Sequence, residues 1–161
     1  MLFRSFSSRR STLAPDSSSK SENQRFIRRQ RITRGADLQS VAREGKRLRT
    51  PLLDVRVAVT SRDESRIGFV VPKHGHSAVR RNRVKRTLRE LARLTVLTAL
   101  RATRAGSSMD IVMRTVPAAY TASFASLREE FETLSARLLR LNNASSRKIK
   151  TEDVSGSSST Q

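Results

Sequence analysis

Residues 80–95 constrain the fold more than any other segment, because a helical wheel divides them into two chemically opposite faces. Val84, Leu88 and Leu91 fall on one face, with Thr95 beside them. The opposite face carries four polar or cationic side chains, namely Asn82, Arg86, Arg89 and Arg93. Such a helix must pack its apolar face on another element and leave its guanidinium groups to water or to a partner.

The pattern changes beyond Thr95, where Leu97 and Leu100 rotate to the other side of the wheel. The helix therefore either ends near Thr95 or finds a second packing partner. Residues 105–108, Ala-Gly-Ser-Ser, break the pattern before the next predicted element.

Four segments show the pattern of β-strands. Residues 53–60 alternate apolar and polar side chains, which predicts a strand with one buried face. Residues 67–71 are almost entirely apolar, so we expect this strand in the interior of the sheet, and Pro72 ends it. Residues 46–50 predict a short basic strand, and residues 109–114 predict a further one.

Two more helices flank these strands. Thr33 is a suitable N-cap for the first of them, and Gly45 is its expected stop. Its apolar residues are Leu38, Val41 and Ala42. The last helix has one apolar stripe, made of Phe124, Leu127, Phe131, Leu134, Leu138 and Leu141. The resulting order of elements is α-β-β-β-α-β-α, which is a mixed α+β fold.

The two ends of the chain lack this patterning. Residues 1–27 are rich in Ser and Arg without sustained apolar periodicity, so we expect a disordered basic arm. An organellar targeting segment has a similar composition, and the role of residues 1–24 stays open. We expect a disordered tail over residues 142–161, which leaves one folded domain over residues 28–141.

The net charge points to a polyanionic partner. Lys and Arg total 33 against 14 Asp and Glu, a formal net charge of +19. Folding does not require this excess, and it favours nucleic acid as a partner ahead of a membrane surface. Residues 25–50 and residues 73–93 each carry a net +7, with Glu90 as the only acid of the second segment. An ordinary solvated helix would mix the two signs, so this clustering favours a binding surface.

Several classes of protein and site find little support in the sequence. The chain has no Cys and only two His, which argues against disulfides and a multi-His metal centre and fits a reducing cytosol. No apolar run reaches the roughly 20 residues that span a bilayer. No second short helix precedes residue 79 to make a helix-turn-helix for DNA.

Catalytic groups are equally scarce. Asp54, Asp63 and Glu64 could suggest a metal nuclease, but one strand residue and two turn residues explain them more simply. Ser77 is better read as a helix N-cap than as a nucleophile. The two histidines of the chain, His74 and His76, have no acid nearby in the sequence that could orient them as bases.

Residues 66–86 resemble the signature of the bacterial ribonuclease P protein subunit. That family has a glycine-containing strand, a Ser-Lys-Lys turn, and then Ala-Val-x-Arg-Asn-Arg-x-Lys-Arg on a helix. The matching residues here are Ala78, Val79, Arg81, Asn82, Arg83, Lys85 and Arg86. Residues 38–45 and 110–114 resemble the first helix and fourth strand of the family, so the resemblance covers residues 28–141.

The resemblance implies a fold and a function. The fold is a small two-layer α/β sandwich with a four-stranded sheet and a left-handed crossover between parallel strands, against the usual rule. The function is removal of the 5′ leader from precursor tRNA in the cytoplasm. In that family the RNA subunit performs the hydrolysis with Mg²⁺, so we expect no catalytic residue and no metal or other cofactor bound by this chain. The implied partners are the RNA subunit and precursor tRNA, with no membrane and no small-molecule substrate.

Two sets of site residues follow from the resemblance. The set expected to bind RNA comprises Lys73, His74, Arg80, Arg81, Asn82, Arg83, Lys85, Arg86, Arg89 and Arg93. The set expected to line a cleft for the leader, between the first helix and the sheet, comprises Leu38, Ala42 and Arg56.

The chain departs from the family in three places. Its turn reads Pro-Lys-His over residues 72–74, so one basic phosphate contact is lost or becomes pH-dependent. The family often has aromatic rings at Leu38, at Ala42 and near Arg56, so the cleft here would be aliphatic and cationic. Residues 92–108 are longer than usual, which implies a helix extension or a loop.

Two other functions remain open at the level of sequence. A ribosomal or general structured-RNA-binding protein would carry the same charge but would bind RNA without stimulating its cleavage. An autonomous nuclease would cleave RNA with Mg²⁺ and the protein alone.

Overall fold

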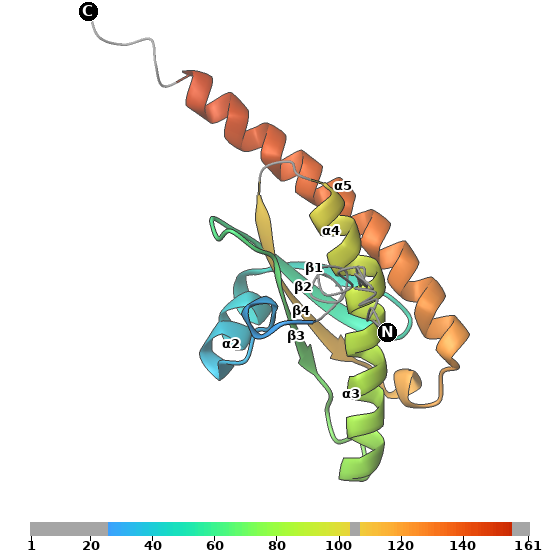
Figure 1. Cartoon of the computed structure of the whole chain (residues 1–161). Helices are drawn as coiled ribbons and strands as arrows, with labels where there is room; N and C mark the ends of the chain where they lie inside the picture. Colours follow the sequence, from blue (N-terminus) through green and yellow to red (C-terminus); the bar gives the residue numbers. More distant parts are fainter. Residues whose placement is uncertain (1–25, 104–106, 156–161) are drawn as a thin grey trace, which may run out of the picture.

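The computed structural model describes residues 26–103 and 107–155, the last ten of these by their backbone alone. In chain order the elements are η1 (Arg28–Gln30), α2 (Gly35–Glu44), β1 (Lys46–Arg49), β2 (Leu53–Thr60), β3 (Arg66–Val70), α3 (Ala78–Ala92), η2 (Arg93–Leu97), α4 (Thr98–Ala102), β4 (Ser108–Thr115), η3 (Pro117–Tyr120) and α5 (Phe124–Ser155) (Figure 1). Because α3, η2 and α4 follow one another as one helical segment, the predicted order and the α+β fold class are confirmed.

The four strands form one sheet in the order β1-β2-β4-β3. β1 pairs antiparallel with β2, and β2 pairs antiparallel with β4. β3 and β4 are parallel and are connected through the helical segment that begins with α3. The handedness of this crossover stays a prediction.

β3 lies at an edge of the sheet, so the prediction that residues 67–71 occupy the sheet interior is wrong. An apolar side chain at every position indicates that both faces of a strand are buried, not that both of its edges are paired. Ile67 and Phe69 face the main core, whereas Val70 faces a small cluster under α2. The outer edge is partly covered by the chain before α2, since the Ile32 amide donates to the Ile67 carbonyl oxygen at 3.1 Å.

The main core lies between one face of the sheet and a layer formed by α3, η2 and α5 (Figure 1). Leu88 and Leu91 of α3 and Phe131 of α5 are at most 1% exposed. They pack with the inward side chains of β2, which alternate with outward ones as the period-two pattern predicts. α2 covers part of the opposite face, where Val41 forms a small cluster with Val112.

η2 is one turn of π-helix, and it explains how the helix continues past Thr95. A π-turn holds more residues than an α-helical turn, so the apolar positions that follow are rotated back toward the sheet. Val96, Leu97 and Leu100 are consequently buried in the main core, where η2 and α4 contact α5. The helix therefore does not end near Thr95 but finds a second packing partner, which is α5.

The folded domain begins earlier than predicted. Phe26 is 7% exposed and lies edge-on to Phe69, with ring centroids 6.2 Å apart. Burial of this apolar ring adds the residue to the core although the surrounding sequence is rich in arginine. The rest of the predicted arm, residues 1–25, lies outside the described residues.

α5 continues to Ser155, so the prediction of a disordered tail is wrong for residues 142–155. Once a packed helix exists, each further residue adds one backbone hydrogen bond, which offsets the modest helix propensity of Asn and Ser. At the other end of α5, Phe124 is exposed and does not belong to the buried stripe. Residues 156–161 lie outside the described residues.

α2 begins and ends for reasons other than those predicted. It starts at Gly35 without a side-chain cap, so Thr33 is not its N-cap. It ends before Gly45 as expected, but this glycine has a φ of −68° and needs no left-handed conformation. Position 45 has no room for a side chain, because a Cβ would lie 2.5 Å from the Val41 carbonyl oxygen and 3.0 Å from the Val57 amide nitrogen.

We expect Gly45→Ala to destabilise the domain by about 1–3 kcal/mol, the usual cost of overpacking. The methyl group would meet backbone atoms of α2 and β2, which cannot move aside without disturbing either element. Gly35→Ala is the matched control, since nothing lies within 4 Å of its Cβ position. Urea unfolding measures both variants, and equal midpoints would contradict this explanation.

Candidate nucleic-acid interface

The loop before α3 is tied to η3 and positions the start of the helix. Ser77 is the N-cap, as predicted, and its side-chain oxygen accepts from the Arg80 amide at 3.3 Å. The ring of His76 lies 4.1 Å from that of Tyr120, centroid to centroid. The Tyr120 hydroxyl donates to the Pro72 carbonyl oxygen. These contacts set the direction in which the first turn of α3 points.

A sharp turn brings Lys73 and His74 to the surface beside this helix start. His74 has a φ of 40° and Gly75 a φ of 76°, so two successive residues occupy the left-handed region. Both Lys73 and His74 are exposed. The turn therefore presents one ammonium and one imidazole next to the first turn of α3.

The two faces of α3 lie as the helical wheel predicts. Leu88 and Leu91 are buried in the main core. On the opposite face Asn82 and Arg86 are exposed, whereas Arg89 and Arg93 are half-buried. Arg83, at the boundary between the two faces, is exposed as well. The apolar face thus anchors the helix, and its polar face is directed at solvent.

The basic face of α3 is crowded with charges of one sign. Arg89 is half-buried, and burial together with Arg31 and Arg86 lowers the pKa of its guanidinium. An arginine remains charged at neutral pH, so the repulsion persists in the free protein. A phosphate between these groups would offset both the burial and the repulsion.

Other predicted RNA-binding arginines are less available for a ligand. Arg93 is paired with Glu90 one helical turn away. Arg80 donates to the Tyr120 carbonyl oxygen at 3.3 Å. Arg81 is half-buried, and its Nε is enclosed without a hydrogen-bond partner. Lys85 is half-buried as well, so the exposed centre of the helix surface is Asn82, Arg83 and Arg86.

A second basic surface lies on the sheet face that carries α2. Strand register places Arg47 opposite Arg56 on this face. In the next row Asp54 lies between Arg49 and Arg114. Arg47 donates to Asp54 at 2.8 Å, and this hydrogen bond lowers the pKa of the Asp54 carboxyl. Four arginines, which we call the sheet-face patch, thus accompany one carboxylate and leave the surface positive.

The residues predicted to line the leader cleft lie on the same side of the sheet as this patch. Leu38 is half-buried over Gly68, where an added Cβ would lie 2.4 Å from its Cδ2. Ala42 is exposed on α2. Arg56 donates to the Gly45 carbonyl oxygen at 3.3 Å, which holds its guanidinium at the end of α2. Their role in binding a leader stays a prediction.

The carboxylates near these surfaces are engaged by arginines. Arg66 donates to Asp110 at 2.9 Å and to Asp37 at 3.2 Å, which ties β3 to β4 and to α2. The hydrogen bond with Asp110 is the main cause that raises the pKa of Arg66. Among the residues that the structure describes, no group of three or more His, Asp or Glu side chains could hold a metal ion.

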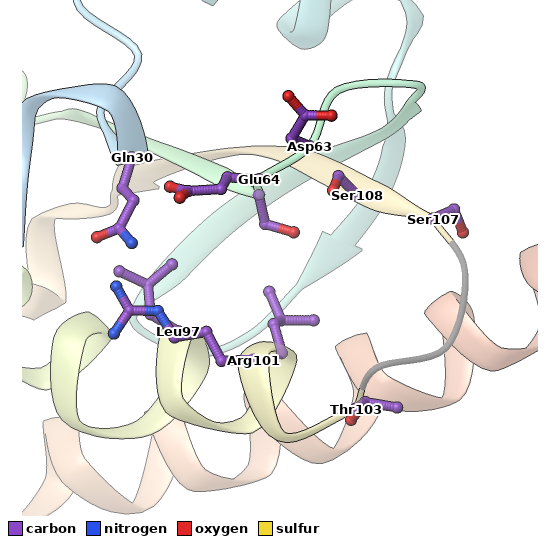
Figure 2. A pocket seen from close by; sticks show the side chains of 10 residues that line it. Gln30, Asp63, Glu64, Leu97, Arg101, Thr103, Ser107 and Ser108 are labelled. Atoms are coloured by element: carbon purple, nitrogen blue, oxygen red, sulfur yellow. The ribbon is translucent and has the colours of Figure 1, made fainter. Parts of the chain in front are cut away.

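Asp63 and Glu64 line a pocket of about 320 Å³ between the β2–β3 turn and α4 (Figure 2). Figure 2 shows Arg101 reaching into the same pocket from the helix on the opposite wall. Glu64 is also paired with Arg29 at 3.0 Å. Two acids accompanied by arginines do not form the carboxylate cluster of a metal nuclease, which favours the reading of this segment as a turn.

The model of the ribonuclease P family matches residues 26–139 of the chain. The ribonuclease P protein component of Acidothermus cellulolyticus is 38% identical over 118 residues, which are 72% of this chain and 93% of that relative. The chain belongs to the ribonuclease P protein family. The corresponding component of Pseudarthrobacter chlorophenolicus is 36% identical, and the match covers 70% of this chain and 80% of that relative.

Solved ribonuclease P proteins have the same fold. The protein from Thermotoga maritima superimposes with a TM-score of 0.53 at 26% identity, covering 66% of this chain and 96% of that one. The protein from Staphylococcus aureus gives a TM-score of 0.55 at 23% identity, covering 65% of this chain and 90% of that one. As a member of this family, the chain is a protein component of ribonuclease P and serves tRNA processing. Within the described residues, no helix has the length and apolarity to cross a membrane.

Arg49 and Arg114 are not among the predicted site residues, but the fold brings them to the sheet-face patch. Alternation within the basic strand places Arg47 and Arg49 on one face, and this signal was available from the sequence. Arg114 lies two strands away from Arg49, so its proximity depends on the pairing of β2 with β4. Register between distant strands is not visible in the sequence of either one.

We expect the double variant Arg83→Ala, Arg86→Ala to bind RNA more weakly and with a flatter salt dependence. Each lost phosphate contact removes about 0.7–0.9 from the slope of log affinity against log salt concentration. Filter binding over a salt series measures this slope. The control is the double variant Arg62→Ala, Arg128→Ala, which removes the same charge at two other places. Arg62 lies in the β2–β3 turn, and Arg128 is paired with Glu132 on α5. Equal flattening in both variants would point to net charge and not to this surface.

Proposed function

We propose that this chain docks on the RNA subunit of ribonuclease P through α3 and holds the 5′ leader of precursor tRNA on the sheet-face patch. Family membership supports the first partner in general terms. The exposed cluster of Asn82, Arg83 and Arg86 supports α3 as the docking element. The repulsion between Arg89 and its cationic neighbours favours binding of a phosphate at the same surface.

The observation that carries the proposal is the position of two basic surfaces on opposite sides of one sheet. α3 belongs to the layer over the main core, whereas the sheet-face patch lies on the side of α2 (Figure 1). Because the sheet separates them, two RNA segments can be bound together without competing for one surface. This arrangement suits a subunit that joins a catalytic RNA to its substrate.

The leader site is cationic in this chain. Arg49 and Arg114 are exposed and flank Asp54, whose charge is already matched by Arg47. A single strand of RNA would place its phosphates along these guanidinium groups, which bind phosphate through two parallel hydrogen bonds. Leader binding then depends on backbone charge and not on base identity.

We place the hydrolysis in the RNA subunit, with Mg²⁺ held by RNA. The described carboxylates support this assignment, since Asp37, Asp54 and Asp110 are each engaged by an arginine. The chain contributes phosphate neutralisation, which lowers the Mg²⁺ concentration that folding and substrate binding by an RNA enzyme require. The cytoplasm, where precursor tRNA is processed in bacteria, is the compartment that this role requires.

Reconstitution tests the function. We expect the protein to stimulate cleavage of precursor tRNA by a bacterial ribonuclease P RNA at low Mg²⁺, where RNA alone is slow. Binding to the RNA without faster cleavage would instead favour a general RNA-binding protein. Cleavage by the protein and Mg²⁺ without the RNA subunit would favour an autonomous nuclease.

We expect Arg49→Ala, Arg114→Ala to raise the KM of the holoenzyme for precursor tRNA by about tenfold or more. Loss of hydrogen bonds to charged groups costs about 1.5–3 kcal/mol each when they are not screened. Affinity for the RNA subunit should not change, because α3 is untouched. A substrate with a leader of only one nucleotide is the control, and an equal rise in KM for both substrates would contradict a leader site.

A further inference from the structure

Phe124 is an exposed phenyl ring, whereas the other Phe and Tyr rings of the described residues are buried. Its side chain is 56% exposed at the start of α5. The other Phe and Tyr side chains among the described residues, Phe26, Phe69, Tyr120 and Phe131, are at most 9% exposed. A large apolar side chain with no place in the core is free to contact a partner.

Phe124 borders a groove of about 630 Å³ between α3 and the junction of η3 with α5. This volume lies within the roughly 300–1,000 Å³ of small-molecule sites. Apolar residues line part of it, including Val84 of α3 and Leu127 of α5. The Arg80 hydrogen bond to the Tyr120 carbonyl oxygen, 3.3 Å long, links its two walls.

The charges around the groove favour an anionic occupant. Arg80 and Arg83 line it, together with Ser77 and Thr87. None of the residues that line this groove is acidic. A flat apolar ring next to two guanidinium groups matches a nucleotide, which joins an apolar base to a phosphate.

The groove continues onto the exposed face of α3. An adjacent hollow of about 360 Å³ is lined by Asn82 and Arg86, and it shares Val79, Arg83 and Thr87 with the groove. The sheet-face patch lies on the other side of the sheet. An RNA segment bound to α3 therefore reaches the groove directly, whereas a leader on the patch does not.

We propose that this groove takes one unstacked nucleobase of the ribonuclease P RNA subunit, stacked on Phe124, with its phosphate on Arg83. The inference rests on the proposed docking of α3 and adds a second recognition mode to it. Phosphate contacts position an RNA but do not distinguish a helix from an unpaired base. A stacking site accepts only a base that is free of its own helix, so it selects the local shape of the RNA.

The test is the affinity of the full chain for its RNA subunit, measured by filter binding. We expect Phe124→Ala to weaken it about 5- to 150-fold, the range that one base stacked on a ring contributes. The salt slope should stay at the wild-type value, because no phosphate contact is lost. Phe124→Tyr should retain the affinity, whereas Phe124→Leu, which keeps the apolar area without the ring, should not.

Controls separate stacking from loss of structure. Val59 is 46% exposed on β2 and lies outside the groove, so Val59→Ala should bind the RNA subunit as wild type does. Thermal unfolding checks that the Phe124 variants are folded, and the exposure of that side chain predicts that they are.

Three results would overturn the inference while leaving the proposed function intact. Phe124→Ala could bind the RNA subunit as tightly as wild type. Phe124→Leu could restore full affinity, as expected for an apolar contact with another protein or a second copy of the chain. The loss could appear only in the KM for precursor tRNA, which would assign the groove to the substrate. If wild type fails to bind the RNA subunit, the proposed function falls together with the inference.

Discussion

Burial of the apolar face of α3 is the interaction on which the rest of the structure depends. Leu88 and Leu91 are enclosed by the sheet and by Phe131 of α5. Each fully buried side chain of this kind contributes about 1.5–3 kcal/mol, which offsets the mutual repulsion of the arginines on the opposite face. The same burial sets the rotation of the helix, so it decides which side chains reach solvent.

Several acidic side chains among the described residues connect elements of the fold. Asp110 and Asp37 bind Arg66 and join β3, β4 and α2. Glu130 accepts from the Leu52 amide at 2.9 Å and links α5 to the start of β2. These acidic side chains lie away from the exposed centre of the basic face of α3, formed by Asn82, Arg83 and Arg86. A site built in this way binds phosphate without a deep pocket.

Local patterns predicted most of the elements but not their arrangement. The alternation of residues 53–60 and the two faces of residues 80–95 both reappear in the structure, because each depends on neighbours within one element. The edge position of β3 was mispredicted, since an apolar strand reports the burial of its faces and not its place in the sheet. In the sequence, the π-turn of η2 shows only as a change in the side of the helix on which apolar residues fall beyond Thr95. Either an end of the helix or a second packing partner would explain that change.

The sequence by itself determined the basic face of α3, the motif that identifies the family, and the excess of arginine that demands a polyanionic partner. These features are local, and they depend on the spacing of side chains along one helix. Tertiary structure alone decided that Arg49 and Arg114 meet on one face, that Phe124 stays exposed, and that α3 and the sheet-face patch lie on opposite sides. Each of these outcomes depends on contacts between segments distant in the chain, where strand register and helix packing are chosen by the whole core.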